Sequence, residues 1–215
     1  MRKLLPIIPF ILGLIFNVSG QDHLEPTNGV FSELKILQRY YNQVSQILLE
    51  GLSERPAAQL VILPSFSKEV VWQVHGDTLT NKFYAVYRTG SESIWYTVNT
   101  NDKAQDIKPL TTEIEISKEA FQIVSKLFAV AISNVKYPIN DRGGTDGANY
   151  FFSSFQYGQG TRSGTIWSPD KKSIMRRLVK ICDELILETE AGLQPTSMQL
   201  KSVEQLTIEF ERIAR

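Results

Sequence analysis

The sequence predicts an α+β fold in which a mainly antiparallel sheet of about five strands is covered, largely on one face, by about four helices. Three observations predict this class. Apolar residues recur at three- and four-residue spacing in four long segments, the period of an amphipathic helix. Between residues 60 and 99, and again over 150–157, β-branched and aromatic residues dominate and the apolar period is two. Turn residues separate these short runs closely enough for consecutive strands to pair as a meander.

Residues 1–20 are expected to be a secretory signal peptide. Two cations precede an apolar run of 13 residues, Leu4 to Phe16, and small side chains at Val18 and Gly20 fit a peptidase site. An uncleaved anchor is the alternative, but the run is shorter than the roughly 20 residues that cross a bilayer. We expect cleavage between Gly20 and Gln21, export to the periplasm or the medium, and no membrane span in the mature chain.

Composition narrows the classes of function. The chain has 215 residues with 23 basic and 23 acidic side chains, and two of the basic ones lie in the leader. This near-neutral balance is unlike the basic excess of a nucleic-acid-binding protein, so no nucleic-acid partner is expected. Cys182 is the single cysteine, which excludes an intrachain disulfide. It lies on the apolar stripe of a predicted helix, so we interpret it as a buried structural residue.

The first part of the mature chain is predicted to be a lead-in followed by a helix. Residues 21–30 are polar and rich in turn formers, which indicates a disordered segment, and 31–215 are expected to form a single α+β domain. An amphipathic helix follows, and Gly51 ends it. Its apolar stripe consists of Leu34, Leu37, Tyr41, Val44 and Leu48.

Four strands are predicted next, over 60–63, 69–75, 82–88 and 94–99, followed by a polar connector to Pro109. Alternation along the second strand places Val70, Trp72 and Val74 on one face. Tyrosine, tryptophan, arginine and glutamine share the faces of these strands, which is typical of a peptide- or glycan-binding surface and also of a sheet half covered by helices. We interpret Trp72 and Trp95 as core residues.

The second half of the chain is predicted to hold three helices and one strand. Ser117 caps a helix that Pro138 ends, and an aromatic strand covers 150–157 between the loops 139–149 and 158–167. Ser168, Pro169 and Asp170 form an N-terminal signal for a helix running to about residue 190. A final amphipathic helix carries Leu200, Val203, Leu206, Phe210 and Ile213.

Two glycine-rich loops were weighed as ligand sites. Residues 140–147 contain two carboxylates but lack the alternating ligands and the distal Glu of a calcium loop. Residues 158–164 miss the dinucleotide fingerprint by one position and lack the Gly-Lys-Ser/Thr of a P-loop. Turn formation explains both loops, so no metal and no cofactor is expected.

The candidate binding residues are Asp141, Asp146, Arg162 and Trp167, all in these two loops. The loops enter the strand 150–157 from opposite ends. Eight residues of strand span about 25 Å, so only one of the loops is expected to belong to any single site.

Three segments carry a resemblance to a known group of proteins. They are Leu63-Pro64-Ser65-Phe66-Ser67-Lys68-Glu69, Asp146-Gly147-Ala148-Asn149-Tyr150-Phe151-Phe152 and Gly164-Thr165-Ile166-Trp167-Ser168-Pro169. Together they resemble uncharacterised exported bacterial proteins with a Pro-Ser-Phe strand entry, an Asp-Gly-x-x-Tyr-x-Phe strand and a Gly-x-x-Trp-Ser-Pro helix start. The resemblance implies export, the α+β class and a bacterial origin, and it implies no activity and no catalytic residue.

These observations favour an exported soluble protein of the bacterial envelope that binds a protein, peptide or glycan partner without catalysis. Two alternatives stay open at this point. One is a hydrolase of envelope glycan or peptide with a carboxylate such as Asp146 as the base, and the other is an envelope structural protein. Two converging ionisable groups in a cleft would favour the enzyme, whereas an aromatic surface would favour the binding protein.

Overall fold

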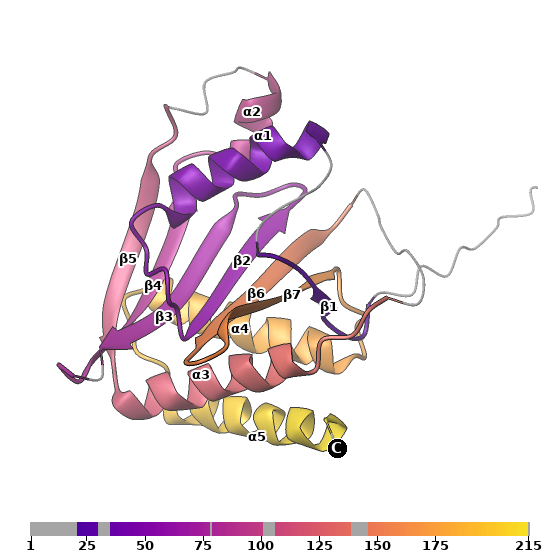
Figure 1. Ribbon diagram of the computed structural model, residues 1–215. Coiled ribbons are helices and arrows are strands. Elements are labelled where there is room, and N and C mark those ends of the chain that lie inside the picture. Colours follow the sequence, from indigo (N-terminus) through magenta and orange to yellow (C-terminus); the bar gives the residue numbers. More distant parts are fainter. Residues whose placement is uncertain (1–20, 30–34, 78, 101–105, 139–145, 215) are drawn as a thin grey trace, which may run out of the picture.

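The computed structural model describes residues 21–29, 35–77, 79–100, 106–138 and 146–214, so the expected signal peptide lies outside the described residues. The described residues form one antiparallel sheet of seven strands with helices on both faces (Figure 1). The strands are β1 (Glu25–Pro26), β2 (Ala58–Pro64), β3 (Val70–Asp77), β4 (Lys82–Gly90), β5 (Pro109–Ile116), β6 (Ala148–Gln156) and β7 (Gly160–Trp167). The helices are α1 (Lys35–Val44) with its π-helical continuation η1 (Ser45–Leu49), α2 (Ile94–Thr100), α3 (Lys118–Ser133), α4 (Ile174–Glu190) and α5 (Ser197–Ile213).

The α+β class and the antiparallel sheet are confirmed, with seven strands where about five were predicted and five α-helices where about four were. The strand order is β1-β7-β6-β2-β3-β4-β5. Strands β2 to β5 form a meander, and β6 and β7 form a hairpin that joins the sheet beside β2. The register pairs Leu63 with Asn149 and Asn149 with Trp167, so one row of residues crosses three neighbouring strands.

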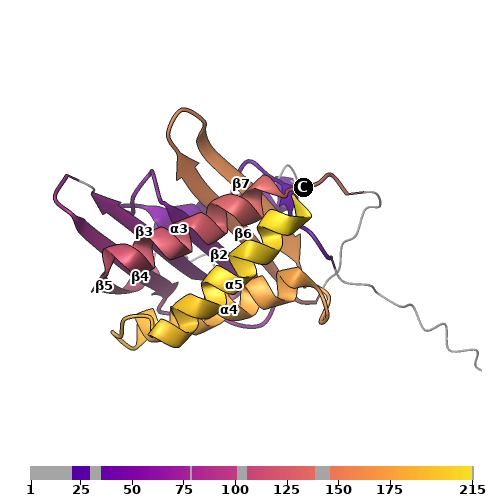
Figure 2. The ribbon, with the colours of Figure 1, turned by 90° about the horizontal axis from the view of Figure 1, so that it is seen from below.

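Helices α3 and α4 cover one face of the sheet, and α5 packs against both of them on the outer side (Figure 2). Trp72 and Val74 of β3 and Phe83 of β4 point into this layer, as the alternation predicts. Trp72 is 1% exposed, and its indole nitrogen donates a hydrogen bond to the Thr189 hydroxyl at 2.9 Å. Cys182 of α4 is also fully buried there, and burial raises the pKa of its thiol. The interpretation of Trp72 and Cys182 as buried residues is confirmed.

Helices α1 and α2 cover the opposite face, which corrects the expectation that helices pack largely on one side (Figure 1). Val61 of β2 and Val71 of β3 are fully buried on this face against Tyr41 and Val44 of α1. The central strands are apolar at both sets of alternate positions, so each face needs a covering layer. Among the described residues, none of the helices is both long and apolar enough to cross a membrane.

Two segments differ in secondary structure from the prediction. Residues 94–99 form helix α2 rather than a strand, and residues 160–167 form β7 rather than a loop. The Ser93 carbonyl accepts the Thr97 amide at 3.2 Å, which starts the helix within a run that has strong β-propensity. Tertiary contacts override the local sequence preference in both segments. In β7, pairing with β6 supplies the hydrogen bonds despite the glycines of this strand.

The segment after the expected cleavage site is ordered, which corrects its prediction as a disordered lead-in. Strand β1 pairs Glu25 with Thr165 at the outer edge of β7. Leu24 is 1% exposed and packs on Gly164, where a Cβ would lie 3.1 Å from that of Leu24. Its carbonyl also accepts the Lys136 amide at 2.9 Å. One buried apolar side chain, strand pairing and main-chain hydrogen bonds therefore dock this polar segment.

Helix α4 begins later than the Ser168-Pro169-Asp170 signal predicts. Its N-cap is Ser173, whose hydroxyl accepts the Arg176 amide at 3.1 Å. Ser168 instead has a φ of 40° and lies in the turn that leaves β7. Its hydroxyl accepts the Ala148 amide at 3.3 Å and so joins the ends of β6 and β7.

Candidate functional site

A pocket of about 470 Å³ lies where the ends of β2, β6 and β7 meet helices α1 and α2. Its volume is within the range of small-ligand sites, roughly 300–1,000 Å³. Six aromatic side chains line it: Tyr40, Tyr41, Phe66, Trp95, Tyr96 and Trp167. The other lining residues are Leu37, Leu63, Pro64, Ser65, Asp146 and Asn149. We call this site the aromatic pocket.

The strand side of the aromatic pocket follows from the register of the sheet. Leu63, Asn149 and Trp167 lie opposite one another on β2, β6 and β7 and therefore share the face toward α1 and α2. The Ser65 amide donates to the Gly147 carbonyl at 2.8 Å, which joins the end of β2 to the residues leading into β6. The pairing of three strands thus fixes this wall.

Gly147 allows Trp167 to lie close to the backbone beside Asp146. Its φ is 142°, a conformation that residues with a side chain rarely adopt. A Cβ at this position would overlap the Ser168 hydroxyl and lie 3.2 Å from the indole nitrogen of Trp167. A glycine is therefore required where the indole packs against the entry to β6.

Edge-to-face ring contacts build the helix side of the aromatic pocket. The ring of Tyr40 lies 5.0 Å from that of Trp95 and 5.4 Å from that of Tyr41, at interplanar angles of 84° and 80°. Tyr41 in turn contacts Phe151 of β6 at 6.0 Å. Such pairs are favoured beyond the area they bury. They hold Trp95 of α2 against α1 and connect both helices to the sheet.

A fully buried carboxylate, Glu69, lies directly behind this aromatic wall. Its Oε1 accepts the Tyr40 hydroxyl at 2.9 Å and the Trp95 amide at 2.8 Å, and its Oε2 accepts the Ile94 amide at 2.8 Å. The two amides begin α2, where a negative charge complements the helix dipole. Burial is the main cause of the raised pKa of the Tyr40 phenol, and the Glu69 carboxylate raises it further. The phenol therefore keeps its proton and donates the hydrogen bond. Glu69 thus positions two residues of the aromatic pocket.

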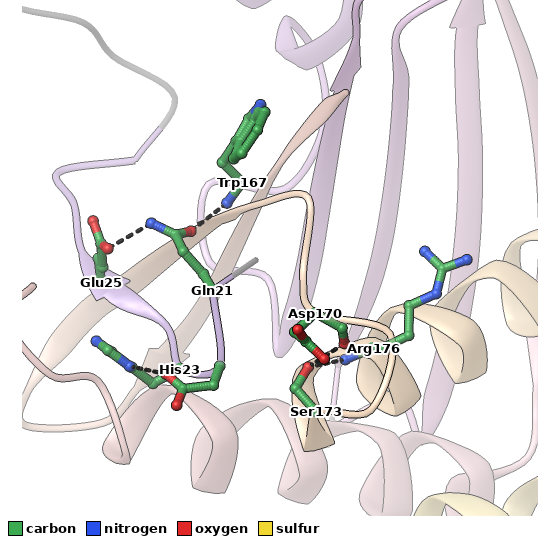
Figure 3. Close-up of polar contacts among 8 residues, drawn as sticks. Gln21, His23, Glu25, Trp167, Asp170, Ser173 and Arg176 are labelled. Atoms are coloured by element: carbon green, nitrogen blue, oxygen red, sulfur yellow. Dashed lines mark hydrogen bonds and ion pairs between the residues drawn. The ribbon is translucent and has the colours of Figure 1, made fainter. Parts of the chain in front are cut away.

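The segment that contains Gln21 and Glu25 supports Trp167 from its main-chain side (Figure 3). The amide of Trp167 donates to the side-chain oxygen of Gln21, whose nitrogen donates to Glu25. The Gln21 carbonyl accepts the Asp170 amide at 3.0 Å. Gln21 is only 5% exposed, and the Trp167 indole points away from it. The segment expected to follow the leader therefore holds the end of β7 in place.

The structure brings two of the four candidate residues together. Asp146 and Trp167 line the same pocket, which corrects the prediction that their loops lie about 25 Å apart. The reason is that residues 160–167 run back along β6 as β7. Arg162 is exposed near the far end of β7, about 16 Å along the strand from Trp167, and its guanidinium contacts Gln159. Asp141 lies outside the described residues.

Charge within the aromatic pocket is limited to one side chain. Asp146 is exposed, and among the lining residues that the structure describes it is the only Asp, Glu, His, Lys or Arg. The described part of the chain contains no group of three or more His, Cys, Asp or Glu that could hold a metal ion. A second hollow of about 800 Å³ adjoins at Trp167, and Lys171, Lys172 and Arg176 give it the opposite charge.

Of the twelve described residues that line the pocket, sequence reasoning proposed only Asp146 and Trp167 as binding residues, and Trp95, Tyr40 and the supporting Glu69 are among those it missed. Trp95 is half-buried and lines the pocket, whereas it was expected in the core of a strand. The serines at 91 and 93 ahead of Ile94 are a helix-start signal that would have placed it on a helix. Tyr40 was interpreted as core only, and Glu69 carries no local signal, because its three donors come from distant segments.

Comparison of the chain with family models, with curated proteins and with solved structures gives no significant match.

Proposed function

We propose that this is an exported, non-enzymatic binding protein of the bacterial envelope, and that it holds a peptide or glycan partner in the aromatic pocket. One observation carries the proposal: six aromatic side chains from four separate segments converge on a cavity of about 470 Å³. Tyr and Trp rings stack on sugars and on peptide groups at a small entropic cost, and they are enriched at binding surfaces.

The contacts that hold the walls of the aromatic pocket favour ligand binding over catalysis. The walls are held by backbone pairing, ring contacts and the Glu69 hydrogen bonds, which is the pre-organisation that raises affinity. Hydrolysis of the glycosidic type needs two carboxyl groups across the scissile bond. The lining contains one, Asp146. A hydrolase with Asp146 as its base is the alternative function, because this carboxylate does face the cavity.

Capture from the envelope fraction of the producing bacterium tests the proposal. The protein, its Trp167→Ala and Phe66→Ala variants and a Tyr157→Ala control are immobilised, and retained peptides and glycans are identified by mass spectrometry. Phe66 is 72% exposed in the pocket rim, whereas Tyr157 is 90% exposed at the far end of the β6–β7 hairpin. We expect one ligand class to be retained by the wild type and the control and lost from both pocket variants.

Equal retention by all four proteins would contradict the proposal. Release of shortened glycan or peptide products by the wild type, abolished by Asp146→Asn, would instead establish the hydrolase. The two readouts are independent, since retention is measured on the resin and products are measured in the flow-through.

A further inference from the structure

We propose that the occupant of the aromatic pocket presents a positively charged nitrogen, held between the aromatic rings and the Asp146 carboxylate. This inference rests on the proposed function and names the chemistry of its ligand. It is carried by the distribution of charge around the cavity together with the placement of the rings.

The described lining of the cavity carries a negative charge and no cation, and the cations Lys171, Lys172 and Arg176 line the adjoining hollow instead. Asp146 is the only charged lining residue, and no ion pair is found for it among the described residues. Glu69 lies one side chain behind the wall, and its three described hydrogen bonds all come from neutral donors. A cation entering the cavity would therefore meet the Asp146 carboxylate, with the buried Glu69 carboxylate behind the wall, and no repelling charge from the described lining.

The rings that remain accessible are suited to a cation. Phe66 and Tyr96 are exposed, Trp95 and Trp167 are half-buried, and they come from different sides of the cavity. The face of an aromatic ring carries partial negative charge and attracts an ammonium or guanidinium group, Trp most strongly. Several rings around one carboxylate are the arrangement that recognises methylated or free amines.

Glu69 strengthens this attraction through Tyr40. The Tyr40 hydroxyl donates a hydrogen bond to the carboxylate at 2.9 Å, and the Tyr40 ring lies 5.0 Å from that of Trp95. Because Glu69 and Tyr40 are buried, their field is screened less than that of a surface pair. The same hydrogen bonds that build the wall therefore favour a cationic occupant over a neutral one of equal size.

Three sources of such a nitrogen are distinguished by probe compounds. Choline represents a small quaternary ammonium, Nα-acetyl-lysine amide represents a peptide side chain, and methyl glucosaminide represents an amino sugar. Their neutral counterparts are 3,3-dimethyl-1-butanol, Nα-acetyl-norleucine amide and methyl N-acetylglucosaminide. Binding is measured by calorimetry and by tryptophan fluorescence, to which Trp95 and Trp167 respond because Trp72 is buried in the core.

We expect at least one cationic probe to bind about tenfold more tightly than its neutral counterpart. Asp146→Asn should weaken that binding severalfold without changing the shape of the cavity, and Trp167→Ala should abolish it. Asp106→Asn, a change of the same kind at an exposed position outside the pocket, should have no effect. The probe that binds identifies the source.

Equal binding of charged and neutral probes, or no binding of any cationic probe, overturns the inference. The capture experiment then separates the two proposals. Pocket-dependent retention of a ligand without a cationic group leaves the proposed function standing, whereas retention that ignores Trp167 and Phe66 removes both.

Discussion

The carboxylate of Glu69 accepts the hydroxyl of Tyr40 at 2.9 Å, a buried contact that joins α1 to the start of β3. Replacement of Glu69 by Ala would leave this hydroxyl and the amides of Ile94 and Trp95 without their acceptor. We expect a loss of about 3 kcal/mol in the free energy of unfolding, measured by urea denaturation.

Two further variants serve as comparisons for the stability of Glu69→Ala. Glu115→Ala, at an exposed position of β5, should change stability by less than about 0.5 kcal/mol. Tyr40→Phe removes only one of the three donors and should cost about 1 kcal/mol. If Glu69→Ala proves as stable as Glu115→Ala, the carboxylate does not organise the wall.

Gly147 is expected to tolerate no side chain. Gly147→Ala combines a φ of 142° with an overlap at Ser168, so we expect a loss of about 2 kcal/mol or more and an altered emission of Trp167. Gly158→Ala is the matched control, because its φ is also positive, 79°, but no atom lies within 4 Å of the added Cβ. It should cost about 1 kcal/mol. Similar losses for the two variants would argue against crowding at Trp167.

Gln21 is expected to affect the aromatic pocket although it does not line it. Gln21→Ala removes the acceptor of the Trp167 amide, and we expect a loss of about 1 kcal/mol and weaker retention of the pocket ligand. The control is Gln122→Ala on the exposed side of α3. Unchanged stability and retention in Gln21→Ala would show that pairing of β1 alone positions the end of β7.

His75 should make stability depend on pH. Burial lowers the pKa of this imidazole, an effect that Glu113 partly opposes, and its Nδ1 is buried without a hydrogen-bond partner among the described atoms. The unfolded chain binds a proton near pH 6.5, whereas the folded chain binds it only at lower pH. The contribution of His75 to stability is therefore complete above about pH 6.5 and falls as the pH decreases through that value.

Comparison with His75→Gln isolates this effect, because every other titrating group is shared. Urea midpoints between about pH 7 and pH 5 should fall more steeply for the wild type than for the variant. Parallel slopes for the wild type and His75→Gln would show that the imidazole titrates alike in both states.

The helices and strands that sequence reasoning predicted well are those in which apolar residues recur at a regular spacing. Helix α3 has its cap at Ser117, whose hydroxyl accepts the Ala120 amide at 3.1 Å. In α5, Val203, Leu206 and Phe210 are buried as expected, whereas Ile213 is 50% exposed. Strands β2 to β4 also lie within a residue or two of their predicted bounds. In these segments burial, propensity and turn residues favour the same structure.

The secondary-structure predictions are wrong where contacts with residues distant in the sequence determine the local structure. Strand β7 contains two glycines and is stabilised by β6 on one side and β1 on the other. Helix α2 has the residue types of a strand, but Glu69, 25 positions before Ile94, accepts its first amides. Asp146 and Trp167 were found as candidates, but the site could not be assembled while β7 was interpreted as a loop.

The docking of Gln21 also constrains when the proposed removal of the leader could take place. A peptidase needs an extended and accessible chain on both sides of the bond it cleaves, whereas Gln21 is 5% exposed and bound to Trp167 and Asp170. If the leader is removed at the expected bond, cleavage has to come first and closure of this edge of the sheet last. Slow processing would leave the outer side of β7 unpaired and open to strand exchange with a second molecule.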